Sequence, residues 1–288
     1  MIRRLRARAA PYLLVLPGGL WLAIFFIVPI VALLALSLET GDIVSGFTQT
    51  FHFGNYADVL SLYHDQFIRS FVYGLIATAA MILIGYPMAY WIAFRGGRHK
   101  STFLFLMLLP FFVTFVLRTV SWQFLLADNG VVLGTLKSWG LLPQSFHVLA
   151  TSFAVIAGLT YNFLPYMVLP IYVALERMDK GLLDAAADLY ASRRAAFRRV
   201  VLPLSIPGVF AGVLLTFVPA VSDYVNAEIL GGPGQVMIGN VIQTLYLTNN
   251  DYPSASALSF VLMAALLVGV VIYARALGTR DVMDMSAA

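Results

Sequence analysis

Six long apolar segments dominate this chain, and each is long enough to cross a lipid bilayer as a helix. The hydrocarbon layer of a bilayer is about 30 Å thick, which takes roughly 20 residues of α-helix to span. The segments are continuous rather than alternating, so they predict helices and not the strands of a membrane barrel. The expected spans are residues 12–38, 68–94, 102–127, 148–175, 206–230 and 254–277.

The composition supports an all-α polytopic membrane protein. With 60% hydrophobic and 11% charged residues, and a mean hydropathy of +0.86, the chain has too little polar surface to cover a water-soluble globule. The sequence contains no cysteine, which excludes disulfides, a thiolate nucleophile and a cysteine metal site. The net charge of +4 comes from basic loops between the apolar segments, so it does not indicate nucleic acid.

The first apolar segment follows a cluster of four arginines, as in a secretory signal peptide. Its apolar run is far longer than the 7–15 residues of a cleavable signal core, so we expect a permanent membrane anchor.

The distribution of basic residues predicts the orientation of the chain. One alternate set of connecting segments, which includes both ends of the chain, holds 15 of the 18 lysines and arginines. Because basic segments remain in the cytoplasm, both termini and the loop at residues 181–203 are expected on the cytoplasmic face of a multi-pass cell-membrane protein.

The loop at residues 181–203 contains the pattern of two short helices. In the first, Asp184 and Asp188 stand four residues apart, where like charges repel slightly on an isolated helix. This repulsion suggests that the face meets a partner or basic residues; the alternative is an amphipathic connection that rests on lipid headgroups. Apolar residues recur at helical spacing over residues 181–189, namely Leu182, Leu183, Ala186 and Leu189.

The second helix is expected over residues 193–202. Ser192 directly precedes it and is a good N-cap residue. Pro203 and Pro207 follow, and we expect these prolines to turn the chain back into the membrane.

The same loop resembles the signature of permease subunits in binding-protein-dependent ABC importers. That family's pattern is Glu-Ala-Ala, three residues, Gly, nine residues and Ile-any-Leu-Pro. Asp184, Tyr190 and Val200 replace the Glu, Gly and Ile at the family's spacing, and the other four positions match. The resemblance implies that the loop docks on an ATPase subunit through Asp184, Ala185, Ala186, Asp188, Tyr190, Ser192, Leu202 and Pro203.

Further stretches resemble spermidine/putrescine-type permeases. The resemblance implies a type I ABC importer permease with about six helices that moves a polyamine by alternating access. It also implies one permease domain over residues 1–288, with an N-terminal anchor and the start of the first external loop at 1–60 and a core at 61–280. The stretches are residues 161–165, 175–179, 218–224, 229–233, 238–242 and 251–253, together with Leu117, Arg118, Thr119 and Trp122.

The resemblance also implies the partners of this chain. These are a second permease subunit, two ATPase subunits and an extracytoplasmic substrate-binding protein. The chain has no Gly-x-x-x-x-Gly-Lys-Ser/Thr loop, so ATP and Mg²⁺ are expected on the ATPase subunits and no cofactor is expected here. Two alternatives stay open: a related permease for another small organic solute or iron, and a stand-alone channel or secondary carrier.

Tyr190 departs from the family pattern in a physically meaningful way. A glycine between two short helices takes a positive φ at little cost. A tyrosine in that conformation would lose about 1 kcal/mol or more, unless the turn has another geometry.

Charged residues inside the expected spans are candidates for the substrate path, because isolated charge is costly in lipid. Arg118 and Asp223 lie at similar depth along the third and fifth spans, so they can form a structural ion pair or line the path. Trp122 and Tyr224 could enclose an alkylammonium group by cation–π contact. The expected path residues are Arg118, Trp122, Asp223, Tyr224, Asn226 and Glu228.

Overall fold

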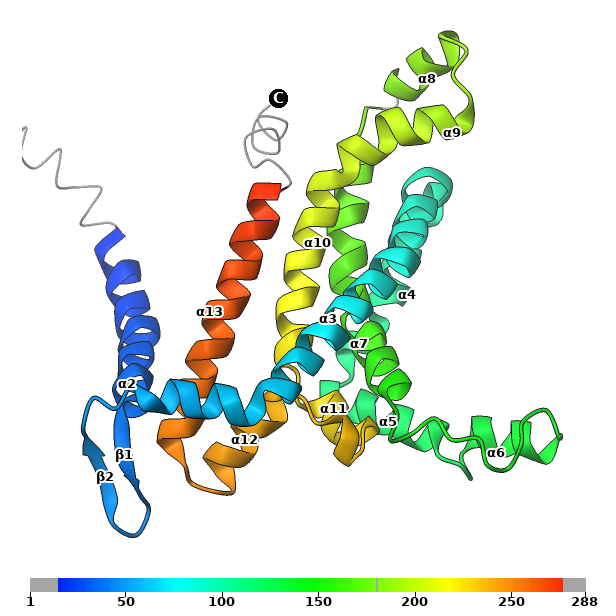
Figure 1. Ribbon diagram of the computed structural model, residues 1–288. Helices are drawn as coiled ribbons and strands as arrows, with labels where there is room; N and C mark the ends of the chain where they lie inside the picture. The colour runs from blue at the N-terminus through cyan, green and yellow to red at the C-terminus, as the bar shows by residue number, and fades with distance from the viewer. Residues whose placement is uncertain (1–14, 180, 277–288) are drawn as a thin grey trace, which may run out of the picture. The chain divides into compact units, whose positions relative to one another are not determined.

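The computed structural model describes residues 15–179 and 181–276 (Figure 1). The chain divides into two compact units, one formed by Met1–His64 and Ile242–Ala264 and the other by Asp65–Val241 and Ala265–Ala288. Among the described residues, five helices are long and apolar enough to cross a membrane, or six when one sharply bent pair is taken as a single span. The predicted helical membrane fold is therefore confirmed.

The first unit begins with helical residues Val15–Ser37, which include η1 (Ala23–Ile27) and α2 (Val28–Ser37). A hairpin of β1 (Glu39–Asp42) and β2 (Gly46–Gln49) follows, within the expected first external loop. Asn55 ties the hairpin to the helix, because its Nδ2 donates to the carbonyls of Ser37 and Glu39 at 3.0 and 2.9 Å. The unit also takes in the starts of α3 (Gly54–Arg95) and α13 (Tyr252–Ala276) and part of α12 (Ile238–Leu247).

The second unit is built around α7 and α10, which share the most extensive contact of any two elements. Met167 and Ile171 of α7 are fully buried in its core. The elements that lie wholly in this unit are η2 (Gly97–His99), α4 (Lys100–Leu108), η3 (Leu109–Phe112), α5 (Phe115–Leu126), α6 (Val131–Ser138), α7 (Ser152–Glu176), α8 (Gly181–Asp188), α9 (Arg193–Ala196), η4 (Phe197–Val201), α10 (Leu202–Ser222), α11 (Val225–Leu230) and η5 (Pro233–Gln235).

Glycines allow α7 and α10 to approach closely. A Cβ added to Gly208 would lie 2.6 Å from the backbone oxygen of Pro170 and 2.6 Å from the Cβ of Ala174. A Cβ on Gly212 would lie 2.7 Å from the sulfur of Met167. Small residues at such contacts let helix backbones pack in the membrane, where water does not drive helices together.

The third predicted span is not one straight helix. η3 ends at Phe112 and α5 begins at Phe115, and the helical segments on the two sides of this break are bent by 90°. Val113 and Thr114 have extended backbone, with ψ of 137° and 149°, so no helical hydrogen-bond ladder runs through them. The expectation of a continuous helix over 102–127 was wrong.

The fifth predicted span is also interrupted. α10 ends at Ser222, Asp223 has an extended ψ of 136°, and the short α11 follows. The expectation of a continuous helix over 206–230 was therefore wrong. The other expected spans have helical counterparts with shifted ends, while residues 12–14 and 277 lie outside the described residues.

The packing of α7 on α10 predicts opposite effects for two glycine substitutions. Gly208→Ala should destabilise the protein by on the order of 1–3 kcal/mol, because the backbone of α7 cannot move aside for the new methyl group. Gly269→Ala in α13 is the matched control, since nothing lies within 4 Å of its added Cβ. Alanine favours helix by about 1 kcal/mol over glycine, so this control should be neutral or stabilising. Thermal unfolding of the purified variants measures both, and equal melting temperatures would contradict the packing account.

Candidate functional site

The loop between α7 and α10 contains two short helices, as predicted, and Figure 1 shows them beyond the ends of α7 and α10. Ser192 caps the second helix, because its side-chain oxygen accepts a hydrogen bond from the Ala195 amide at 3.3 Å. On the inner side, Leu183 and Phe197 pack against the core of the unit. On the outer side, Leu189 is 82% exposed. The hairpin therefore has an anchored face and a free apolar edge.

Tyr190 occupies the turn between these helices in the left-handed conformation, with φ of 56°. The Ala191 amide donates to the Ala186 carbonyl at 3.0 Å, and the Tyr190 amide donates to the Ala187 carbonyl at 2.9 Å. This pair of bonds is the Schellman motif, which places its left-handed residue where glycine is usual. The strain expected for a tyrosine here is therefore present, and its side chain is 98% exposed.

The second helix of the loop runs directly into the fifth span. Residues Arg193–Ser222 form one helical run, in which the π-turn η4 joins α9 to α10. Pro203 lacks an N–H and its ring clashes with the carbonyl four residues earlier, and the wider π-turn just before it accommodates this defect. The expectation that Pro203 and Pro207 turn the chain was wrong, because both lie inside the helical run.

A buried polar network joins α5, α7 and α11. The Oδ1 atom of Asp223 accepts hydrogen bonds from the backbone N–H and the Nδ2 of Asn226, at 2.8 and 3.1 Å. Asn162 of α7 donates from Nδ2 to the Oδ1 of Asn226 and to the Oγ1 of Thr119, each at 3.0 Å. Asp223 therefore fixes the start of α11, and Asn162 joins α7 to α5 and α11.

Two candidates for the substrate path, one aromatic and one acidic, lie on the accessible side at the start of α11. Tyr224 is 44% exposed and Glu228 is also exposed. Asn240, at the start of α12, donates from Nδ2 to the Glu228 carboxylate at 3.0 Å and to the Tyr224 carbonyl at 2.9 Å. Asn240 thus holds the Glu228 carboxylate and the backbone at Tyr224 in place.

Arg118 and Trp122 line a hollow of about 390 Å³ beside the break between η3 and α5. The guanidinium of Arg118 lies over the ring of Phe111, 4.6 Å from its centroid. Trp122 contacts Tyr161 of α7, with ring centroids 5.2 Å apart. Ser121 adds a hydroxyl to the lining of this hollow.

The ion pair considered between Arg118 and Asp223 is not formed. Within residues 15–179 and 181–276, no carboxylate lies within ion-pair distance of Arg118. Similar depth would bring Arg118 and Asp223 together only on straight helices. Both helices are broken next to these residues, at Val113–Thr114 and at Asp223, so depth along the sequence does not give their distance. Likewise, Tyr224 is not among the residues that line the hollow with Trp122.

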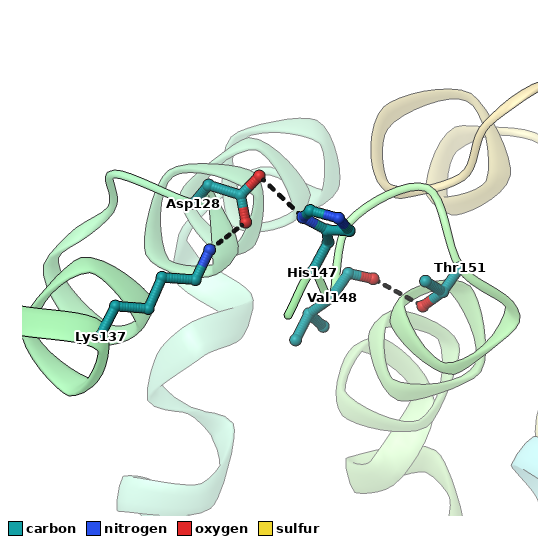
Figure 2. A network of polar contacts seen from close by, with 5 residues as sticks. All are labelled: Asp128, Lys137, His147, Val148 and Thr151. Carbon is teal, nitrogen blue, oxygen red and sulfur yellow. Dashed lines mark hydrogen bonds and ion pairs between the residues drawn. The ribbon is translucent and has the colours of Figure 1, made fainter. Parts of the chain in front are cut away.

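A second polar network fixes the segment between α5 and α7 (Figure 2). Lys137 is 7% exposed and donates from Nζ to Asp128 at 2.8 Å. The other oxygen of Asp128 lies 3.3 Å from Nδ1 of His147. Thr151 then caps α7, because its side-chain oxygen accepts from the Ala154 amide at 3.3 Å.

Several of these residues do not stand out in the sequence. Asn162 carries no charge, but an amide in the middle of an apolar segment is itself a signal of a buried polar contact. Asn240 and Lys137 give no such signal, because their partners are distant in sequence or lie across a loop. Among the described residues, no group of three or more histidine or acidic side chains could hold a metal ion.

Comparison with known proteins gives the family. Residues 81–278 match the model of the binding-protein-dependent transport system inner membrane component. The chain belongs to this family. It is 34% identical over 92% of its length to the spermidine/putrescine transport system permease protein PotB of Salmonella typhimurium (strain SL1344), covering 94% of that protein. It is 35% identical over 89% of its length to PotB of Haemophilus influenzae, covering 90% of that protein.

A solved structure confirms the fold of this permease. The chain aligns with a chain of a bacterial ABC transporter involved in the import of the acidic polysaccharide alginate, with a TM-score of 0.72. The alignment covers 96% of this chain and 98% of the other, at 19% identity. The predicted type I ABC importer permease fold is therefore confirmed.

The strained turn at Tyr190 predicts that glycine is the better residue there for local stability. Tyr190→Gly should stabilise the Schellman turn by about 1 kcal/mol, which corresponds to roughly fivefold slower amide exchange in α8. Tyr190→Ala is the matched control, because it removes the ring but keeps the left-handed strain. Hydrogen–deuterium exchange of residues 181–191 measures both, and equal exchange in the two variants would contradict the assignment of strain.

Proposed function

We propose that this permease is one of two membrane subunits of an ATP-driven importer for polyamines of the spermidine/putrescine class. Each subunit forms half of the path, which opens to the two sides of the membrane in turn. Similarity to the PotB proteins over most of the chain supports the cargo class. The remaining parts of the system are two ATPase subunits, which bind ATP and Mg²⁺, and an extracytoplasmic binding protein that delivers the cargo.

The exposed two-helix hairpin is the observation that carries this proposal. Its outer edge presents Leu189 and Tyr190, at 82% and 98% exposure, next to a cluster of arginines. Exposed apolar and aromatic residues of this kind are typical of the centre of a protein–protein contact. Because residues 193–222 form one helical run, a partner that moves the hairpin also moves the fifth span. The charge distribution of the chain supports a cytoplasmic hairpin and cytoplasmic termini.

The proposed docking surface is the outer part of this hairpin, where α8 presents exposed Asp184 and Ala185. Asp188 and Tyr190 continue it, while Ser192 holds the second helix in place. The other proposed docking residues are Ala186, Leu202 and Pro203.

For the path, we assign supporting roles to the buried candidates and cargo contact to the exposed ones. Asp223 and Asn226 are buried and bonded to each other, so we assign them a positioning role. Tyr224 and Glu228 are exposed and can offer an aromatic face and a carboxylate to an ammonium group. Arg118 and Trp122 lie in the separate hollow beside the break in the third span. We also propose that residues 1–60 form an anchor segment and that residues 61–280 form the permease core.

The docking proposal predicts that reversing the charge on the hairpin uncouples transport. Asp184→Arg combined with Ala185→Arg should reduce ATP-dependent spermidine uptake at least tenfold in vesicles that contain the full complex, because two bulky cations would disrupt a packed contact. Membrane insertion should be unchanged, since both residues are exposed.

A matched control uses the same substitutions elsewhere. Ala57→Arg with Asp58→Arg makes the same chemical change on an exposed turn of α3 and should leave uptake intact. Uptake at the wild-type rate by the hairpin variant would remove the docking claim. Uptake of another solute, with spermidine ignored, would remove the polyamine assignment but keep the transport mechanism.

A further inference from the structure

Arg118 is a buried cation whose hydrogen-bonding capacity is largely unmet. The residue is 8% exposed, and its Nε and Nη1 atoms are buried with no hydrogen-bond acceptor in the structure. Its contacts with charge character are the rings of Phe111 and Phe115, at 4.6 and 5.7 Å from the guanidinium carbon. A ring face attracts a cation but does not satisfy the in-plane N–H donors of a guanidinium. Arg118 therefore needs an oxygen acceptor.

The described part of this chain does not provide that acceptor, since none of its carboxylates lies within ion-pair distance of Arg118. Asp223 accepts from Asn226, and Glu228 accepts from Asn240. The remaining engaged pairs of the unit are Asp128 with Lys137 and Glu176 with Lys100. The buried Oδ1 of Asn162 also has no hydrogen-bond partner, so it does not serve Arg118 either. Among the described residues no acceptor is in place, which points to a neighbouring molecule as its source.

The surroundings of Arg118 indicate what kind of molecule provides the missing oxygen acceptor. The hollow of about 390 Å³ also contains Ser121, Trp122 and Tyr161, whose polar atoms are few against an apolar wall. Its apolar lining is exposed, with Leu109 at 48% and Val113 at 45% exposure. A single unpaired charge within an apolar surface is unfavourable against lipid tails, which offer no acceptor. The same arrangement is usual at the centre of a protein interface, where arginine is enriched and water is excluded.

We propose that this hollow receives a carboxylate side chain from the second permease subunit, which pairs with Arg118 across the interface. The planar fork of a guanidinium matches a carboxylate with two parallel hydrogen bonds. Ser121, Trp122 and Tyr161 line the same hollow, and the Ser121 hydroxyl already donates to the Leu117 carbonyl at 2.8 Å, so Arg118 is the cationic donor of the site. The inference rests on the proposed function for the existence of a second permease subunit.

This proposal makes predictions of opposite sign for the isolated chain and for the assembled pair. Arg118→Gln removes an unpaired buried charge from the chain alone, so the melting temperature of the purified chain should stay equal or rise. In the complex, the same change leaves the partner's carboxylate buried without its cation, which is strongly unfavourable. The variant should therefore be recovered with the second permease subunit at roughly one tenth of the wild-type yield or less. A residue needed only for folding of this chain would lower the melting temperature instead.

The test is tandem purification of the co-expressed importer through a tag on this chain, followed by quantification of the second permease subunit. Arg275→Gln, an exposed arginine in the last turn of α13, is the matched control for loss of one positive charge. Arg118→Lys keeps the charge without the fork and should give an intermediate yield. Wild-type yield with Arg118→Gln would overturn the interface ion pair but leave the proposed function intact. Failure of the wild-type chain to recover any second permease would overturn both.

A cross-link identifies what occupies the hollow. Ser121→Cys places one cysteine at the hollow of a chain that has none, and a maleimide-linked benzophenone attached there reports its neighbours. The expected adduct is with the second permease subunit, and it should be lost when Arg118→Gln is added. An adduct with lipid alone would overturn the proposal. The proposal would also be overturned if added glutamate, a free carboxylate, blocked labelling of the Ser121→Cys variant while no adduct with the second subunit formed.

Discussion

Hydrocarbon cannot satisfy a backbone amide or a buried charge, and this constraint explains the unusual features of the permease. Two of its expected spans are broken, at Val113–Thr114 and at Asp223–Tyr224. At the second break, the Asp223 carboxylate accepts from the Asn226 amide and so replaces part of the missing helical ladder. Gly158 lets α7 come close enough to this point, because a Cβ there would lie 2.7 Å from the Asn226 side-chain oxygen.

The same constraint distinguishes the buried side chains around α11, which are hydrogen-bonded within the chain, from the exposed ones. The buried amides of Asn162 and Asn226 are bonded within the chain, so they hold α7 and α11 together. Tyr224 and Glu228, on the accessible side of the same short helix, remain available for contacts. In the proposed importer, this division gives a stable brace behind a surface that can meet cargo. Arg118 is the buried charged group in the described part of the chain whose N–H donors find no acceptor there.

Sequence patterns predicted the spans and the hairpin because both depend on local composition. Continuous apolar runs identify membrane helices, and Ser192 followed by Arg193 identifies a helix start, which the bond from the Ala195 amide confirms. The left-handed strain at Tyr190 was also predicted, since it follows from one position of a turn.

The helix breaks, and the hydrogen-bond and ion-pair partners of buried side chains, could not be predicted from local composition. Whether Pro203 turns a chain or is absorbed by a π-turn depends on packing around the helix, and here the helix continues. Similar depth of Arg118 and Asp223 suggested a pair, but side-chain direction depends on bends that the apolar pattern does not encode. The acceptors of Asn162 come from other helices, so its role appears only in three dimensions.

In the proposed importer, the hairpin and the fifth span form one stiff lever between the ATPase and the membrane path. Arg193 and Leu215 are exposed, and Arg193 is not among the proposed docking residues, so both can be replaced by cysteine and spin-labelled in this cysteine-free chain. Double electron–electron resonance on the reconstituted complex then measures the distance between the labels without nucleotide and with nucleotide trapped. We predict the same narrow distance distribution in both states, while uptake remains ATP-dependent. A shift of about one helical turn, roughly 5 Å or more, would show that the joint bends and would contradict the account.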